Sequence, residues 1–512
     1  MPTSTPSITE IAAGALGIKL PALPAKPFVG LRPFNSDEAL LFFGRHEQTI
    51  ELLRQLHDTH FVALVGSSGC GKSSLVRAGL IPRLKAGFLV EEREKWLIAT
   101  MKPGDAPLKN LATALHTNLS QTDHSALQTA LQSDNAENIT PLLNQLAPAL
   151  NAADANLLLL VDQFEELFRF GLESGKPENR AAAKRFVALL LALSRQRQLP
   201  VYVVLTMRSD FIGDCDNFPG LPEALNRSQY LVPRLTREQL RQAIEGPLHL
   251  FGASLSPDLL TRVLDDVGEQ SDQLPVLQHA LMRTWEQWQK ERTSDGGTEG
   301  TRDEGAEGKP DTANLQPLTV AHYETVGTLT EALSRDAEAA LEGLTEKELK
   351  ITERIFCALT DTDESNRRIR RPAHLDELSA IALTNHDTAL KIIKRFSDSP
   401  RSFLVINEGR DKDDPLIDIS HESLIRQWKT LRQWMEHENN SREIYLRLVS
   451  AAKRYQAGRG ERLRGVDLQE ALTGMRKTSS MKTGDSAIPK TSTISIWQLT
   501  FCQRVKASRS CN

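Results

Sequence analysis

The residues with the clearest chemical capacity lie at positions 66–73, which read Gly-Ser-Ser-Gly-Cys-Gly-Lys-Ser. This segment matches the pattern Gly-x-x-x-x-Gly-Lys-Ser/Thr, follows a short apolar run at 61–65, and leads into a helical pattern at 73–84. In this context glycines let backbone N–H groups enclose a phosphate, and the N-terminus of the following helix favours anions. The pattern therefore predicts a P-loop that binds ATP with Mg²⁺.

Each residue of the predicted loop has an expected role. Lys72 should reach the β- and γ-phosphates and stabilise charge during phosphoryl transfer, and the Ser73 hydroxyl should ligate Mg²⁺. The residues expected to surround the nucleotide phosphates are Gly66, Ser67, Ser68, Gly69, Cys70, Gly71, Lys72, Ser73 and Ser74.

Carboxylates follow the apolar run at 157–161. Asp162 comes directly after this run, and a carboxylate at the end of a buried strand can hold the magnesium ion, through water. Glu165 lies one short step onward, where it can polarise the water that attacks the phosphate. The alternative is that Glu165 and Glu166 only begin a helix, where acidic side chains suit the helix dipole.

A third apolar run, at 201–207, is followed by Arg208. Ligands bind beyond the carboxyl ends of strands in open α/β sheets, so Arg208 is a candidate sensor of the γ-phosphate. The alternative is an ordinary surface arginine. An arginine finger cannot be assigned, although Arg227 and Arg234 are candidates among several arginines.

The elements that must position these residues alternate along the first half of the chain. Strand patterns at 61–65, 96–101, 157–161 and 201–207 are separated by helical patterns, among them 108–119, 165–170 and 179–195. Such alternation predicts an α/β fold, a parallel sheet with helices on both faces.

The second half of the chain has a different pattern. Helical segments at 349–359, 376–383 and 389–396 precede an extended pair at 403–407 and 416–420, which is the order of a winged helix, and helices follow at 428–437 and 442–455. The predicted division is a flexible leader (1–26), a P-loop NTPase core (27–235), a helical subdomain (236–290), a disordered linker (291–316), a helical and winged-helix domain (317–437), a helical extension (438–465) and an irregular tail (466–512).

Composition narrows the class of protein. Hydrophobic residues make up 40% and charged residues 25% of 512 residues, which indicates globular domains, and the net charge of −4 disfavours a dedicated nucleic-acid binder. Five scattered cysteines lack metal-ligand spacing and suit a reducing compartment. Because no signal peptide and no membrane-spanning run is evident, we expect a cytoplasmic protein without a membrane partner.

Taken together, the motifs resemble the STAND class of signal-transduction ATPases, and most closely the family called Novel STAND NTPase 1, over residues 27–465. The segments that carry the resemblance are 28–34, 42–45, 162–168, 206–211, 226–236, 273–279 and 419–422. The resemblance implies that Gly44 and Arg45 lie near the base and that Pro275 contacts adenine. It also implies that His421 contacts the β-phosphate of ADP, whereas the plain alternative for His421 is a capping or surface histidine.

The function that the resemblance implies is a switch, in which bound ADP holds the winged helix closed and exchange for ATP opens or oligomerises the chain, with slow ATP hydrolysis. Self-association or protein partners in the ATP state follow from it. One alternative is a DNA-acting ATPase or transcription regulator that uses the winged helix as a reader, with Lys391, Lys394, Arg395 and Arg401 as its basic face. A metabolic kinase is a further alternative, but no second substrate pocket is evident.

Overall fold

The structure is a computed structural model. It describes residues 24–87, 93–119, 122–132, 138–172, 177–268, 273–295, 316–362, 368–398, 401–407 and 414–456. The greater part of the predicted leader, the predicted tail and the end of the predicted helical extension therefore lie outside the described residues.

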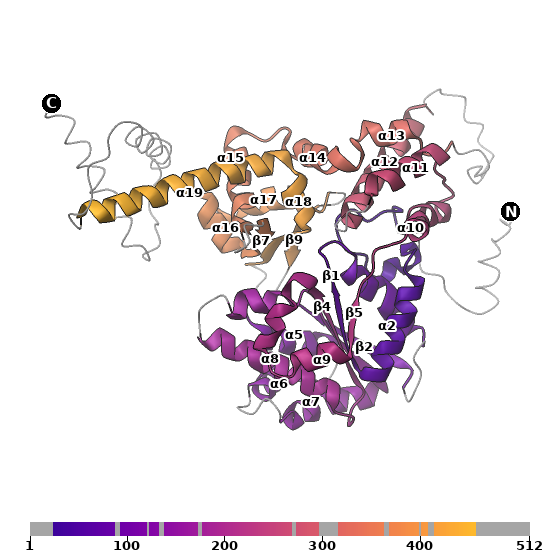
Figure 1. The fold of residues 1–512 in the computed structure, drawn as a ribbon, viewed down its shortest axis with the longest axis vertical. Helices are drawn as coiled ribbons and strands as arrows, with labels where there is room; N and C mark the ends of the chain where they lie inside the picture. Colours follow the sequence, from indigo (N-terminus) through magenta and orange to yellow (C-terminus); the bar gives the residue numbers. More distant parts are fainter. Residues whose placement is uncertain are drawn as a thin grey trace.

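A five-stranded parallel sheet forms the centre of the first half of the chain, with the strand order β2-β3-β4-β1-β5 (Figure 1). The strands are β1 (Phe61–Gly66), β2 (Lys95–Met101), β3 (Ala155–Val161), β4 (Val201–Arg208) and β5 (Gln229–Leu231). All residues of β1 and β3 are buried, because helices cover both faces of the sheet. The predicted parallel sheet is confirmed, and the short strand β5 was not predicted.

Alternate residues of β1 enter two different cores, as the period of two in a strand requires. Phe61, Ala63 and Val65 pack with the helices at 107–118, 140–153 and 177–195, whereas Val62 and Leu64 pack with the helices at 46–59 and 81–85. The helices around the sheet are α2 (His46–Thr59), α3 (Lys72–Ser74), η2 (Leu75–Leu80), α4 (Ile81–Lys85), α5 (Pro107–Asn118), α6 (His124–Leu131), α7 (Thr140–Ala153), α8 (Pro177–Arg195) and α9 (Leu221–Arg227), with short helices η1 (Ser36–Leu41), η3 (Phe168–Leu172), η4 (Ser209–Phe211) and η5 (Gly213–Asn217).

The middle of the chain is a group of helices with its own core, in which Trp285, Trp288 and Tyr323 are buried. The helices are α10 (Arg237–Leu250), α11 (Pro257–Val267), α12 (Leu274–Asp295), α13 (Val320–Thr325) and α14 (Thr328–Leu341). The prediction of a disordered linker from residue 291 is wrong for residues 291–295, which continue α12. The Arg292 guanidinium lies 4.7 Å from the Trp288 ring and stabilises this last stretch of the helix.

The C-terminal unit, residues 346–456, combines helices with a three-stranded antiparallel sheet of order β8-β10-β9 and a two-stranded β6-β7 pair. Phe356, Phe396 and Trp428 form its aromatic core. The elements are α15 (Glu346–Ala358), β6 (Thr360–Thr362), β7 (Arg368–Arg370), β8 (Ala373–His374), α16 (Leu375–Ala382), α17 (His386–Ser397), β9 (Leu404–Asn407), β10 (Leu416–Ile419), α18 (Glu422–Gln427) and α19 (Lys429–Gln456).

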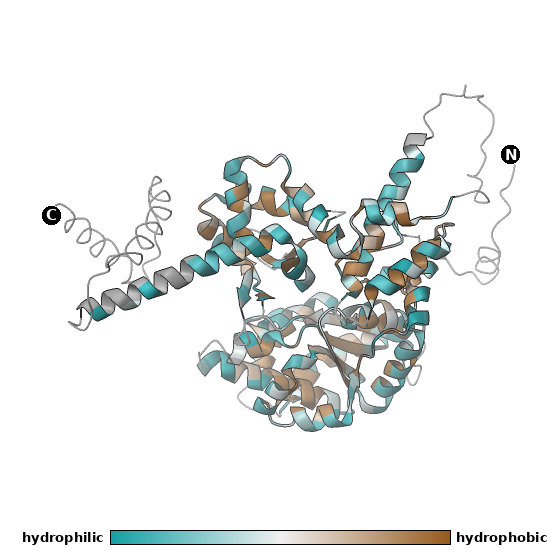
Figure 2. Ribbon diagram, turned by 45° about the horizontal axis from the view of Figure 1, so that its top comes forward, coloured by the Kyte–Doolittle hydropathy of each residue, from teal (hydrophilic) through white to brown (hydrophobic). Residues whose placement is uncertain are grey.

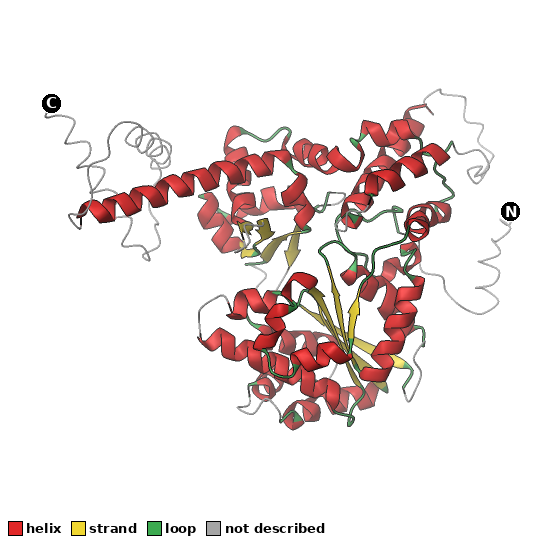
Figure 3. Ribbon diagram, viewed as in Figure 1, coloured by secondary structure: helices red, strands yellow, loops and turns green. Residues whose placement is uncertain are grey.

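Helix α19 projects away from the rest of the molecule (Figure 3). It is continuous, so the prediction of two separate helices at 428–437 and 442–455 is wrong, because the polar residues between them are compatible with an exposed helix. Hydrophobic colouring concentrates on the central strands rather than on α19 (Figure 2). In the described part of the chain, no helix has both the length and the apolar character needed to cross a bilayer.

Gly44 lies close to the backbone of α10, where the NTPase core meets the middle helices, and this predicts an effect on stability. Its φ is +80°, and a Cβ atom there would lie 2.3 Å from the backbone oxygen of Gln239. We expect Gly44→Ala to lower the free energy of unfolding by about 2 kcal/mol or more, because neither the backbone conformation nor the carbonyl can adjust freely. Thermal and denaturant unfolding would measure this.

The matched control is Gly213→Ala, where the added Cβ meets nothing within 4 Å. A Gly44→Ala protein as stable as the control would show that α10 does not pack against residue 44 in this way.

Candidate functional site

A cavity of about 280 Å³ opens at the carboxyl ends of the sheet strands and is also lined by α12 and by the C-terminal unit. Its lining divides into an apolar part and a polar part, as expected for a ligand with a flat apolar ring and an ionic group. The apolar part includes Leu31, Pro33, Phe34, Leu41, Phe42, Phe43, Leu235, Leu274, Pro275 and Leu277, and the polar part includes Ser68, Lys72, Ser73, Asp162, Glu165, Arg208, Arg370, His421 and Glu422.

The P-loop connects β1 to the helix that starts at Lys72, and Gly69 and Gly71 have φ values of +75° and +94°. These conformations favour glycine, which explains the spacing of the motif. The Lys72 ammonium donates to the carbonyl oxygens of Gly66 and Ser67 at 2.9 and 2.7 Å. Lys72 therefore lies against the loop that it is expected to serve.

The Asp162 carboxylate is buried directly after β3 and accepts hydrogen bonds from three side chains, two on the P-loop helix and one on β4. Ser73 donates at 2.8 Å, Arg77 at 2.7 Å and Thr206 at 2.5 Å. Burial raises the pKa of Asp162, but the Arg77 charge and the hydroxyl donors outweigh it, so that the pKa lies below its usual value. The adjacent oxygens of Ser73 and Asp162 are the hard ligands that Mg²⁺ prefers, so this pair fits the ion.

Glu165 and Glu166 lie just beyond Asp162 and face different surroundings. Glu165 accepts from the Arg208 backbone N–H at 3.3 Å, and burial raises its pKa. Glu166 accepts from the Gly104 N–H at 3.1 Å, and burial raises its pKa to about 7, although the charges of Lys102 and Arg370 oppose this. Glu165 lines the cavity, so it is placed to accept a proton from a water there.

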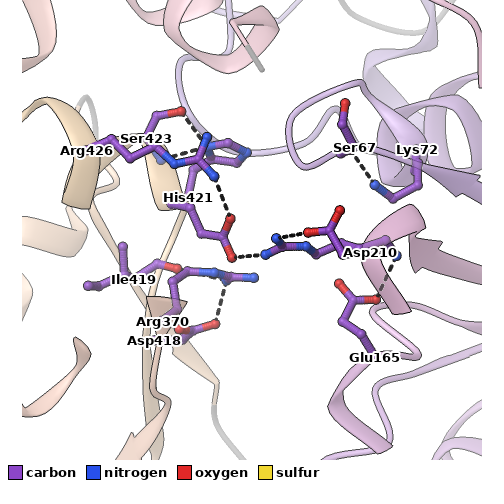
Figure 4. Close-up of polar contacts among 12 residues, drawn as sticks. Ser67, Lys72, Glu165, Asp210, Arg370, Asp418, Ile419, His421, Ser423 and Arg426 are labelled. Carbon is purple, nitrogen blue, oxygen red and sulfur yellow. Dashed lines mark hydrogen bonds and ion pairs between the residues drawn. The ribbon is translucent and has the colours of Figure 1, made fainter. Parts of the chain in front are cut away.

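Arg208 connects the sheet to the C-terminal unit. One guanidinium nitrogen lies 2.6 Å from the Glu422 carboxylate. Another lies 2.6 Å from the carboxylate of Asp210, which is labelled in Figure 4. The Arg208 and Glu422 side chains are only 12% and 8% exposed, so solvent screens this ion pair little. The ordinary surface arginine that was the alternative for Arg208 is not what the structure shows.

A second arginine, Arg370 on β7, faces the same junction. It donates to Asp418 at 2.8 Å and to the carbonyl oxygen of Ile419 at 3.0 Å. Burial is the largest single influence on the Arg370 pKa and lowers it. The charges of Asp418, Glu422 and Glu166 together outweigh burial, so the pKa lies above its usual value. Arg370 therefore adds positive charge to the cavity from the C-terminal unit.

His421 is the N-cap of α18, and its Nδ1 accepts from the Ser423 N–H at 3.1 Å. A neutral ring with Nδ1 as acceptor carries its proton on Nε2. The capping role that was the plain alternative is therefore present, and His421 also lines the cavity. The two roles use different ring nitrogens and are compatible.

The residues expected near the base occupy different positions. Pro275, in the first turn of α12, lines the cavity beside apolar side chains. The Arg45 guanidinium donates to the carbonyl oxygens of Pro233 at 2.7 Å and Cys70 at 3.1 Å, so it holds the P-loop to the segment after β5. Ser74 accepts from the Phe34 N–H at 3.2 Å and thereby joins the loop at 28–34 to the P-loop helix.

The cavity brings together most of the residues predicted from the sequence. Those that line it are Arg45, Ser68, Gly69, Gly71, Lys72, Ser73, Ser74, Asp162, Glu165, Arg208, Pro275 and His421. Gly44, Gly66, Ser67 and Cys70 are not among the lining residues. Arg77, Glu422 and Arg370 line the cavity but were not predicted as site residues. Arg77 is four residues after Ser73 on the same helical face, and Glu422 lies in the segment 419–422 that carries the resemblance, so both had a signal in the sequence.

The four residues proposed as a basic DNA-reading face have other neighbours. Arg395 donates to the carbonyl oxygen of Ala340 at 2.7 Å, Arg401 lies 3.5 Å from Asp336, and Lys391 lies 3.4 Å from Glu348. Lys394 is exposed. Two of these charges therefore form ion pairs within the chain, and a third residue, Arg395, is held by a backbone carbonyl oxygen.

The parallel sheet, the glycine-rich loop and the carboxylate after β3 define a P-loop NTPase, and nucleotide binding follows from that class. Residues 27–462 match the family Novel STAND NTPase 1, and the chain belongs to that family. This agrees with the resemblance found in the sequence. No curated protein matches the chain.

Among solved structures, the chain is similar to Aeropyrum pernix ORC2 in ADPNP-ADP complexes, with a TM-score of 0.39 and 13% identity over 81% of this chain and 96% of that one. It is also similar to Pyrobaculum aerophilum Cdc6p, with a TM-score of 0.31 and 11% identity over 77% of this chain and 94% of that one. For the Thermotoga maritima RuvB Holliday junction branch migration motor the TM-score is 0.32, with 13% identity over 77% of this chain and 97% of that one. Each TM-score is below 0.5, so these similarities do not bear on the function of this chain.

The raised pKa of Glu166 predicts that the stability of the protein depends on pH. Its pKa in the folded protein is about 7, against an ordinary 4.5, so its contribution to stability is complete below about pH 4.5 and is lost as the pH rises through 7. We expect Glu166→Gln to be more stable than the wild type at pH 8, by about 2–3 kcal/mol, because the amide needs no ionisation inside the protein. The gain should shrink towards pH 5, as measured by unfolding at each pH.

Glu94→Gln, a substitution of an exposed glutamate before β2, is the control and should change stability little at either pH. A Glu166→Gln effect that does not depend on pH would contradict the assigned titration.

Proposed function

We propose that this protein is a STAND-type molecular switch that binds ATP and ADP with Mg²⁺, hydrolyses ATP slowly and regulates a signalling or defence response. The observation that carries the proposal is the composition of the cavity wall. Lys72 and Ser73 of the P-loop line the same cavity as His421 and Glu422 of the C-terminal unit. A nucleotide in this cavity therefore contacts both parts, and its phosphates can influence how they are placed.

The P-loop side supplies the binding groups. Lys72 holds the β- and γ-phosphates, the backbone of 66–71 encloses them, and Ser73 and Asp162 hold Mg²⁺. The ring of the base lies against the apolar part of the cavity, next to Pro275, while Gly44 and Arg45 shape the wall behind it. The helix that begins at Lys72 points its N-terminus at the phosphates, which adds to the attraction.

The C-terminal unit is proposed to be a winged helix. The order α15, β8, α16, α17, β9, β10, with an antiparallel β8-β10-β9 sheet, is the order expected of that fold. In the ADP state the His421 Nε2–H donates to the β-phosphate and stabilises the closed arrangement. The division proposed from the sequence is kept for the NTPase core, 27–235. The helical subdomain proposed for 236–290 is extended to include α13 and α14, which pack in the same core as α12.

Hydrolysis transfers the γ-phosphoryl group to water. Glu165 accepts the proton of the attacking water, and Lys72 with Arg208 stabilises the charge on the transferring group. Glu422 holds Arg208 at 2.6 Å in the closed arrangement, which is the physical reason for expecting a slow reaction. ATP binding opens the chain and exposes surface for self-association or a protein partner in the cytoplasm.

The nucleotide carried by the purified protein tests the switch. We expect wild-type full-length protein to retain ADP through purification, which chromatography after denaturation would detect. Lys72→Ala should lose it through removal of the phosphate-binding charge, and His421→Ala should lose it in large part through removal of the closing contact. We expect the loss of affinity to be about 100-fold for Lys72→Ala and about 10-fold for His421→Ala.

His437→Ala, a substitution at an exposed histidine of α19, is the matched control and should retain ADP. A wild type that carries no nucleotide but binds added ATP would leave the NTPase assignment intact and reject the closing role of ADP.

The assignment of Glu165 predicts a specific loss. Glu165→Gln should reduce the rate of phosphate release from ATP by about 100-fold while leaving the affinity for ADP within about threefold, since a general base acts in the reaction and not in binding. The exposed Glu178→Gln serves as control. An unchanged turnover in Glu165→Gln would assign the base to another residue.

A further inference from the structure

Glu422 occupies a position between two elements that flank nucleotide phosphates. Its carboxylate lies 2.6 Å from Arg208 at the end of β4, and it lines the same cavity as Ser68 of the P-loop. In the sheet register, Arg208 lies directly opposite Gly66, the first glycine of the loop. The Glu422 carboxylate therefore reaches the cavity from the C-terminal unit and ends among phosphate-binding groups.

This carboxylate is negatively charged and hardly hydrated. Burial opposes ionisation, but the charges of Arg208 and Arg370 outweigh it, so the pKa of Glu422 lies below its usual value. The side chain is 8% exposed, so water and salt screen its charge weakly. A second anion at the same guanidinium would meet strong repulsion.

We propose that Glu422 makes the closed protein selective for a nucleoside diphosphate, because its carboxylate lies where the terminal phosphate of a triphosphate needs Arg208 and Ser68. The inference rests on the proposed function and assigns the residue that discriminates between its two nucleotides. A diphosphate lacks the terminal phosphoryl group, so the ion pair between Arg208 and Glu422 can remain. A triphosphate brings a more highly charged group to the same place, and Glu422 must withdraw with α18.

The surroundings of Arg208 support an exchange of one anion for another. Its Nε is buried and has no hydrogen-bond partner among the described residues, so the guanidinium retains a donor for a phosphate oxygen. Its other partner, Asp210, lies only two residues along and can remain in place. When Glu422 withdraws, Arg426 on the same helix, 3.5 Å from it, keeps a charge of opposite sign beside it.

A simpler role for Glu422 is a tether that stabilises the closed arrangement without regard to the nucleotide. The two roles predict opposite effects of Glu422→Gln, which preserves shape and removes charge. A tether predicts weaker ADP binding, because the closed arrangement is lost. Charge competition predicts tighter binding of the triphosphate with little change for ADP.

The test uses full-length protein with Mg²⁺ and measures the affinities for ADP and for a non-hydrolysable ATP analogue by displacement of a fluorescent nucleotide. We expect the wild type to prefer ADP, and Glu422→Gln to bind the analogue at least about 10-fold more tightly while its affinity for ADP changes less than about threefold. Glu422→Asp, which keeps the charge, should keep the preference. Glu377→Gln, which removes an exposed carboxylate paired with Arg371, is the matched control and should behave as wild type.

Three outcomes would overturn the inference. Unchanged affinity of Glu422→Gln for the analogue would show that the carboxylate does not compete with the terminal phosphate. A lower affinity for ADP alone would identify a tether. A wild type that binds neither nucleotide would reject the proposed function together with this inference, whereas the first two outcomes leave the proposed function standing.

Discussion

Ionised side chains buried between the sheet and the C-terminal unit constrain the rest of this structure. A buried charge is costly unless it meets an opposite charge and hydrogen-bond donors. Arg208 and Glu422 meet that requirement only when the two parts are placed as they are, whereas Arg370 and Asp418 meet it within the C-terminal unit. Such pairs add little net stability compared with apolar packing, because the desolvation of the two charges offsets most of their attraction. They therefore select one arrangement more than they stabilise it.

The Asp162 carboxylate applies the same constraint inside the NTPase core. Ser73, Arg77 and Thr206 come from two different segments of the chain and converge on one buried carboxylate. Their convergence sets the distance between the P-loop helix and the ends of β3 and β4. The geometry that we propose for holding a magnesium ion thus also joins neighbouring strands, and we expect a change at Asp162 to affect both.

The sequence was sufficient to predict those elements whose structure depends on neighbouring residues alone. The apolar runs that became β1, β3 and β4 are buried on both faces, and the P-loop glycines adopt conformations that few other residues tolerate. Strand β5 was not foreseen, since three residues with one buried side chain, Tyr230, carry no readable period. The start of the linker was placed too early because a polar stretch can still be helical when Trp288 supports it.

The contacts that sequence could not supply join distant segments. Arg208 and Glu422 are 214 residues apart in the chain, and a lone glutamate after a histidine normally indicates an exposed helix start. Arg370 belongs to a run of arginines that composition alone would place on the surface. The roles of both residues depend on their burial, and they become buried only when the C-terminal unit lies over the sheet.

Helix α19 gives the junction a mechanical property. Glu422 begins α18, and after Trp428 the chain continues directly into α19, which has 28 residues and projects from the body. At about 1.5 Å per residue the helix is roughly 42 Å long, so a tilt of about 10° at its base carries its far end through about 7 Å. A displacement of ångström size at one carboxylate is thereby converted, as by a lever arm, into a movement large enough to make or break contact with another molecule.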